Sequence, residues 1–132
     1  MAISYADDKF VRGDEMLELY REAGWSLLEA RSAPRLEEAV KRSQRFFTAR
    51  DGSRLAGFLM ALTDEKLYAH VSELLVPAAS RAKGVEAELL ARFLASVEHV
   101  EVVTLFGEPD SVELYRDLGF VPFAGGFRLR RS

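Results

Sequence analysis

One stretch, residues 67–94, constrains the fold more than any other part of the chain. Leu67 to Val76 is mostly apolar, as expected for a buried strand, and Pro77 follows it. After a linker of small residues, the run Arg81-Ala82-Lys83-Gly84 opens a helix that we expect to continue from Lys83 to about Val97. The first amides of a helix lack intrahelical partners, and the dipole places about half a positive charge there. The stretch therefore predicts an anion-binding site where the strand meets the new helix.

The segments on either side of this stretch predict a mixed sheet. Residues 100–106 are apolar and β-branched, so strand, long helix and strand form a βαβ unit with parallel strands and a right-handed crossover. Strand composition at residues 45–50 and 54–62, joined by Asp51-Gly52, indicates a hairpin. Together with residues 67–76 these strands predict an antiparallel meander. The expected fold class is α/β, with a central sheet flanked by helices.

The N-terminal third predicts one short strand and two helices. Ala2 to Tyr5 is the candidate strand. Asp14 is the expected N-cap of a helix over residues 15–23, which Gly24 ends. Ser32 caps a second helix that extends to about Gln44, with a proline in its first turn.

The C-terminal end predicts a short helix and two further strands. Asp110 and Glu113 have the spacing of a capping box for a helix through Leu118. Residues 120–123 and 127–131 have strand composition, separated by Gly125-Gly126. No internal repeat or linker is found, so we expect a single domain over residues 1–132.

Composition excludes several classes of protein. The 132 residues include no cysteine, which excludes disulfides, thiolate metal sites and a cysteine nucleophile. No apolar run approaches the ~20 residues of a membrane span, and the first residues do not resemble a secretory signal. The net charge of −3 argues against nucleic acid as a partner. His70 and His99 are far apart in sequence, so no metal site is expected. These features fit a cytoplasmic protein.

Three local motifs, in this order of elements, resemble the GNAT superfamily of N-acetyltransferases. Arg81-x-x-Gly84-x-Glu86 is similar to the family's Gln/Arg-x-x-Gly-x-Gly/Ala, which opens the central helix. Leu114-Tyr115-Arg116-Asp117-Leu118-Gly119-Phe120 is similar to the family's Leu-Tyr-x-x-x-Gly-Phe. Leu19-Tyr20-x-x-x-Gly24-Trp25 looks like the first helix of one small bacterial branch. The resemblance covers nearly the whole chain.

The resemblance implies that the chain uses acetyl-coenzyme A as cosubstrate. Its pyrophosphate would lie on the amides that open the central helix, from Arg81 to about Ala87, and its pantetheine arm along the preceding strand. Arg81 and Lys83 add positive charge, and Gly84 lets the backbone approach the phosphates closely. The predicted cosubstrate-binding residues are therefore Leu74, Leu75, Val76, Arg81, Ala82, Lys83, Gly84 and Val85.

The resemblance also implies two catalytic residues. Tyr115 lies at the position from which the family's tyrosine protonates the departing thiolate, and the alternative is a core tyrosine on an amphipathic helix. Glu73 matches a glutamate that takes a proton from the incoming amine through water. His70 is a weaker candidate for this base. It lies on the opposite face of a regular strand from Glu73, although a β-bulge would change that parity.

The expected function is therefore transfer of an acetyl group from acetyl-coenzyme A to an amine by direct attack. The amine belongs to a small molecule or peptide that the sequence does not specify, and dimerisation is common among relatives. Glu86 stands where the family has glycine or alanine, and Glu108 where an asparagine is common. These departures support an alternative, a GNAT-like module that binds acyl-coenzyme A or regulates without catalysis. A protein-interaction domain of α/β architecture is a third interpretation.

Overall fold

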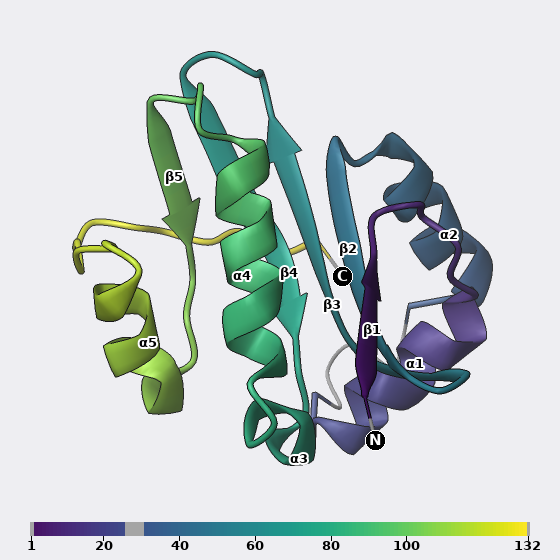
Figure 1. Cartoon of the computed structure of the whole chain (residues 1–132). Coiled ribbons are helices and arrows are strands. Elements are labelled where there is room, and N and C mark those ends of the chain that lie inside the picture. Colours follow the sequence, from purple (N-terminus) through teal and green to yellow (C-terminus); the bar gives the residue numbers. More distant parts are fainter. Residues whose placement is uncertain (1, 26–30, 132) are drawn as a thin grey trace.

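The five strands form one sheet whose spatial order follows the chain (Figure 1). The structure is a computed structural model that describes residues 2–25 and 31–131. The strands are β1 (Ile3–Ala6), β2 (Arg45–Asp51), β3 (Arg54–Thr63), β4 (Tyr68–Leu75) and β5 (Val102–Leu105). Neighbouring strands are antiparallel except β4 and β5, which are parallel. The predicted meander, the βαβ unit and the mixed α/β class are thereby confirmed.

Helices cover both faces of this sheet. In Figure 1, α1 (Gly13–Glu22) and α2 (Ala33–Arg42) lie on one face, and α4 (Val85–Ser96) lies on the other. The short α3 (Ala78–Arg81) joins β4 to α4, and the 3₁₀ turn η2 (Pro109–Ser111) leads from β5 into α5 (Val112–Asp117). Within the described ranges, no helix has the length and apolar character needed to cross a bilayer.

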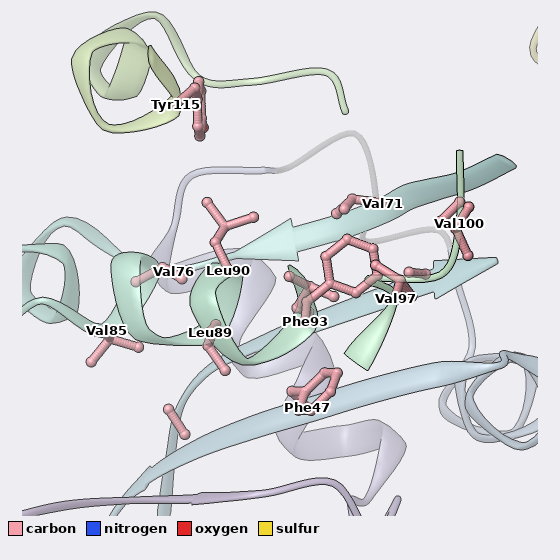
Figure 2. Packing of buried hydrophobic residues seen from close by; sticks show 14 residues of the cluster. Phe47, Val71, Val76, Val85, Leu89, Leu90, Phe93, Val97, Val100 and Tyr115 are labelled. Carbon is pink, nitrogen blue, oxygen red and sulfur yellow. The ribbon is translucent and has the colours of Figure 1, made fainter. Parts of the chain in front are cut away.

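Side-chain alternation along the strands builds a separate hydrophobic core on each face. Phe47 of β2 packs with Leu89 and Phe93 of α4 in one core, as Figure 2 shows. The adjacent Phe46 belongs to the other core, together with Tyr20 of α1. Successive strand side chains point to opposite faces, so one strand supplies both cores. The sheet is thus held in place from both sides.

The two strands predicted near the C-terminus are wrong. Residues 120–131 adopt no regular secondary structure in the part of the chain that the structure describes. Gly119 and Gly125 have φ values of +99° and +107°, which break an extended strand, and Pro122 has no backbone N–H to donate. An alternating sequence becomes a strand only where a partner strand and a core receive it, and here neither does.

Three predicted helix starts are also corrected. Asp14 lies inside α1, whose N-cap is Arg12, and the Arg12 N–H donates to the Glu15 carboxylate at 2.9 Å. Asp110 lies in η2 and makes no capping box, because α5 is preceded by Ser111 as N-cap. The central helix begins at Val85 rather than Lys83. Gly84 has a φ of +79°, which a right-handed helix cannot contain.

The predicted N-cap of α2 is confirmed. The Ser32 hydroxyl accepts a hydrogen bond from the Arg35 N–H at 3.2 Å, as the predicted N-cap of α2 requires. Trp25, which directly follows the end of α1, stacks on Tyr20 with ring centroids 6.0 Å apart. Trp25 is therefore packed against the helix that it follows.

A bidentate ion pair connects the start of α1 to β2. Both terminal nitrogens of Arg50 donate to the Glu15 carboxylate, each at 2.9 Å. The hydrogen bond from Arg50 lowers the pKa of Glu15 below its ordinary value. Because the folded state favours the ionised carboxylate, the pair stabilises the fold above the ordinary pKa and loses this contribution as the pH falls.

We expect Glu15→Gln to lower the free energy of unfolding by about 1–3 kcal/mol at neutral pH, since it removes the negative charge and one of the two oxygens that accept from Arg50. The difference from the wild type should shrink as the pH falls below the ordinary glutamate pKa of 4.5, towards the lowered value of Glu15. Urea denaturation between about pH 3 and about pH 7 measures both effects. Glu18→Gln, an exposed position on the same helix, serves as the control. A difference that does not change with pH would contradict this account of the pair.

Candidate active site

The parallel strands β4 and β5 diverge where their pairing ends, and a cleft opens there. Their pairing runs from Tyr68 with Val102 to Val71 with Leu105, where β5 ends. Beyond this point β4 continues to Leu75 while paired only with β3. One edge of β4 therefore faces a gap, at the carboxyl ends of parallel strands where α/β proteins commonly bind ligands.

A cleft of about 440 Å³ lies at this divergence. It is lined by Gly24, Trp25 and Arg31, which follow α1, and by the end of β4, the end of β5, α5 and the C-terminal segment. The lining includes both predicted catalytic residues, Glu73 and Tyr115, and one predicted cosubstrate-binding residue, Leu74. The tertiary fold thus brings residues that are far apart in the sequence to one cavity.

A β-bulge in β4 decides which way Glu73 points. Met60 pairs with Glu73 and Ala61 with Val71, so Ser72 is the extra residue. Val71 belongs to the core beneath α4, whereas the Glu73 side chain contacts Tyr20 on the α1 side. In a regular strand Val71 and Glu73 would share a face. The bulge therefore turns Glu73 away from the α4 core and into the cleft.

Two side chains hold the Glu73 carboxylate by the same oxygen. The Tyr20 hydroxyl donates to Oε1 at 2.7 Å, and Arg31 donates to Oε1 and forms an ion pair. Burial, followed by the negative charge of Glu73, raises the pKa of Tyr20 far above its ordinary value, so Tyr20 stays a proton donor. Among the described residues, no side chain or amide donates to Oε2. The carboxylate is therefore anchored through Oε1, and Glu73 lines the cleft.

Tyr115 is fixed by close packing and by two hydrogen bonds. A Cβ atom on Gly107 would lie 2.1 Å from the Tyr115 ring, so only glycine fits beneath it. The Tyr115 hydroxyl accepts from the Glu108 N–H at 3.0 Å and donates to Glu86 Oε2 at 3.3 Å. Burial raises the pKa of Tyr115, the Glu108 amide opposes this, and the charge of Glu86 adds to it. The phenol is consequently protonated at neutral pH.

Glu86 occupies the family's small-residue position, yet its carboxylate is turned towards α5. The residue is 5% exposed. Oε1 accepts from the Ser111 hydroxyl at 2.6 Å, and Oε2 accepts from Tyr115. Figure 2 shows Tyr115 extending from α5 towards α4. Glu86 therefore joins the central helix to α5 by hydrogen bonds, and its charge is directed towards these donors.

Only some of the backbone amides that were predicted to bind the pyrophosphate are open. The amides of Arg81, Ala82, Lys83 and Gly84 already donate to backbone carbonyls between 3.0 and 3.1 Å away. Across the described residues, the amides of Val85, Glu86 and Ala87 have no acceptor. Lys83 lies 3.6 Å from Asp51 in a partly exposed ion pair. The open anion-binding end is thus formed by the first three residues of α4.

The histidines form no site with one another. His70 Nδ1 lies 2.8 Å from the Thr104 hydroxyl, and burial lowers the pKa of His70. His99 instead contacts Glu65 at 2.9 Å. His70 does not line the cleft. In the ranges 2–25 and 31–131, no group of three metal-ligating side chains is found.

Comparison with known proteins agrees with this architecture. The family model described as an acetyltransferase (GNAT) domain matches residues 16–127, and the chain therefore belongs to the GNAT acetyltransferase family. No curated protein sequence matches the chain. Many solved structures match its fold.

Three of these structures illustrate the likeness. A GNAT-family acetyltransferase from Streptococcus pneumoniae is 23% identical with a TM-score of 0.79, covering 99% of this chain and 100% of its own. A Staphylococcus aureus candidate acetyltransferase of unknown function has a TM-score of 0.86 at 15% identity, covering 98% and 100%. A candidate acetyltransferase from Deinococcus radiodurans is 26% identical with a TM-score of 0.76, covering 98% and 88%. At such sequence identities the similarity shows a shared fold.

Sequence reasoning missed four side chains that line the cleft or support Glu73. Tyr20 was contained in the Leu19-to-Trp25 motif, but its spacing indicated only the core face of a helix. Arg31 gave no signal, because an isolated arginine in a loop has no periodic partner. Arg128 and Arg130 alternate with apolar residues, which predicted a strand and assigned neither arginine to the cleft. Contacts between distant segments decided all four.

We expect Glu86→Gln to lower the pKa of Tyr115, since it removes a negative charge that raises this pKa while keeping a hydrogen-bond acceptor. Carbon NMR of labelled tyrosine, with Tyr115→Phe to assign the resonance, follows the titration. Glu113→Gln, an exposed position on α5, should leave the Tyr115 titration unchanged. An unchanged Tyr115 titration in Glu86→Gln would show that the two groups do not interact in solution.

Proposed function

We propose that this acetyltransferase transfers the acetyl group of acetyl-coenzyme A to an amine, by direct attack within a ternary complex. One observation carries the proposal. Glu73 and Tyr115, which come from different elements, line the same cleft at the divergence of β4 and β5. A proton acceptor and a proton donor on one cavity are the two groups that aminolysis of a thioester requires.

The open amides of Val85, Glu86 and Ala87 support acetyl-coenzyme A as the cosubstrate. They lie at the positive end of a twelve-residue helix, where a pyrophosphate can accept their hydrogen bonds. Arg81 and Lys83 would add charge from the preceding turn, and Gly84 supplies the left-handed turn that exposes these amides. The edge of β4 at Leu74 and Leu75 faces no β5 residue and, with Val76 directly after it, is available to the amide groups of a pantetheine arm. The cosubstrate supplies the reactive thioester.

In this proposal Glu73 accepts the proton of the incoming amine, directly or through water. The hydrogen bonds from Tyr20 and Arg31 fix its carboxylate, so Oε2 faces the acceptor. Tyr115 gives a proton to the departing sulfur, and its raised pKa keeps this proton available. A rotation about the phenolic C–O bond transfers the donated hydrogen bond from Glu86 to the sulfur.

The second candidate function is a module that binds acyl-coenzyme A without acetyl transfer. One observation favours it: the Tyr115 hydroxyl is already engaged by Glu86 and by the Glu108 amide. If these bonds hold in solution, the phenol cannot reach the sulfur. Release of coenzyme A thiol in the presence of an amine panel separates the two functions.

Calorimetry is expected to show saturable binding of acetyl-coenzyme A, with a dissociation constant below about 1 mM. No binding at millimolar concentrations would contradict both candidates. With an accepted amine, Tyr115→Phe should lower kcat by about 10²–10⁴-fold, because it removes the general acid. Tyr68→Phe, at an exposed position outside this cleft, should leave kcat unchanged. Unchanged turnover in Tyr115→Phe would remove the acid role while leaving the binding proposal intact.

Glu73→Gln should lower kcat/KM for the amine by about 10²–10⁴-fold and leave the affinity for acetyl-coenzyme A unchanged. The reduction should diminish at high pH, where the amine loses its proton to solvent. Steady-state rates between neutral and alkaline pH measure this dependence. Glu101→Gln, an exposed residue before β5, is the control. A loss that is equal at every pH would instead assign Glu73 to substrate binding.

Several expectations from the sequence stay predictions. They are a single domain over residues 1–132, a cytoplasmic location, a homodimer, and no nucleic acid or membrane as partner. Sedimentation of the purified chain tests the homodimer.

A further inference from the structure

The C-terminal segment brings two arginines into the cleft. Gly125, with a φ of +107°, turns the chain after α5, and the segment then crosses the sheet behind the strands in Figure 1. Residues 127–130 are all exposed, Phe127 to 99%, and among them Arg128 and Arg130 line the cleft. In an extended segment alternate residues share a side, and both arginines lie on the side of the cleft that Glu73 and Trp25 also line.

The charges of the cleft leave these arginines without a described partner. Arg31 is paired with Glu73, and Glu108 is the other acidic residue of the lining. Among the described residues, neither Arg128 nor Arg130 forms an ion pair or a side-chain hydrogen bond. The whole chain carries a net charge of −3, so the positive character belongs to this cleft and not to the protein in general.

We propose that the acceptor amine carries an anionic group, a carboxylate or a phosphate, that Arg128 and Arg130 bind. The inference rests on the proposed function and names the class of acceptor. Guanidinium groups form forked, charge-assisted hydrogen bonds to both kinds of anion. Because Glu73 lies in the same cleft, an acceptor held by its anion directs its amine to the carboxylate. A simple cationic amine would meet two further positive charges, for which the described residues offer no ion-pair partner, and bind weakly.

The arginines have a second conceivable ligand, the phosphates of the cosubstrate. The open amides of α4 already provide a site for these phosphates, and Arg128 and Arg130 reach the cleft from the segment that crosses the opposite face of the sheet. The proposal therefore requires that losing both arginines weakens the acceptor and leaves acetyl-coenzyme A unaffected. This difference is measurable.

Tryptophan fluorescence reports on this cleft directly, since Trp25 is the sole tryptophan of the sequence and lines it. Inorganic phosphate and acetate are titrated separately into protein saturated with coenzyme A, which occupies the amides of α4. We expect a saturable change for at least one anion, and an affinity at least tenfold lower in the double variant Arg128→Gln/Arg130→Gln. The control Arg35→Gln/Lys41→Gln removes the same charge from exposed positions on α2. Equal affinities in the two double variants, or no saturable change with either anion, would overturn the proposal.

Turnover measured with matched pairs of acceptor amines is the second test of the proposal. Glycine is compared with glycinamide, and glucosamine 6-phosphate with glucosamine, so that each pair differs mainly in the anion. We expect the anionic member of one pair to have a kcat/KM at least tenfold higher, and the double variant to remove this preference through KM. A raised KM for acetyl-coenzyme A in the double variant would assign the arginines to the cosubstrate and overturn the proposal. If coenzyme A does not bind at all, the proposed function fails, and the anion titrations on the free protein still decide the role of the arginines.

Discussion

The divergence of β4 from β5 is the constraint on which the rest of the site depends. A parallel pair that stays together offers only a closed sheet surface, whereas here β5 ends at Leu105 and β4 continues to Leu75. The bulge at Ser72 adds to this, since it rotates the last part of β4 so that Glu73 faces α1. Two backbone features, the end of the β4–β5 pairing and the bulge at Ser72, therefore create the cavity and orient Glu73.

The two ends of the cleft are held by different kinds of interaction. Glu73 is held by polar contacts from Tyr20 and Arg31, which belong to the α1 face. Tyr115 is held mainly by packing on Gly107 and by the buried bond to Glu86. Since a buried carboxylate is costly without donors, Ser111 and Tyr115 must stay close to it. Glu86, which departs from the family pattern, thus also holds α5 against α4.

The alternation of the C-terminal segment shows how a correct pattern can give a wrong element. Residues 127–131 do alternate, and the alternation does sort arginines from apolar side chains. No strand forms there because β5 offers the segment no hydrogen bonds and neither core contains Phe127 or Leu129. Similarly, Asp110 and Glu113 had the spacing of a capping box, but Ser111 took the N-cap position and donates its hydroxyl to Glu86. A local pattern predicts which residues share a side of a segment, and tertiary contacts decide what this side packs against.

The sequence by itself determined the order of strands and helices as far as α5, the mixed sheet and, through the family resemblance, the two residues that the proposed chemistry uses. Hydrophobic period, Asp51-Gly52 and the motifs around Gly84 and Tyr115 are local signals, and local geometry follows from them. Only the tertiary structure decided that Glu73 faces Tyr20, that Glu86 turns towards α5, and that Arg128 reaches the cleft. The physical reason is that burial and hydrogen bonding of a polar group depend on partners far away in the chain, which no local pattern encodes.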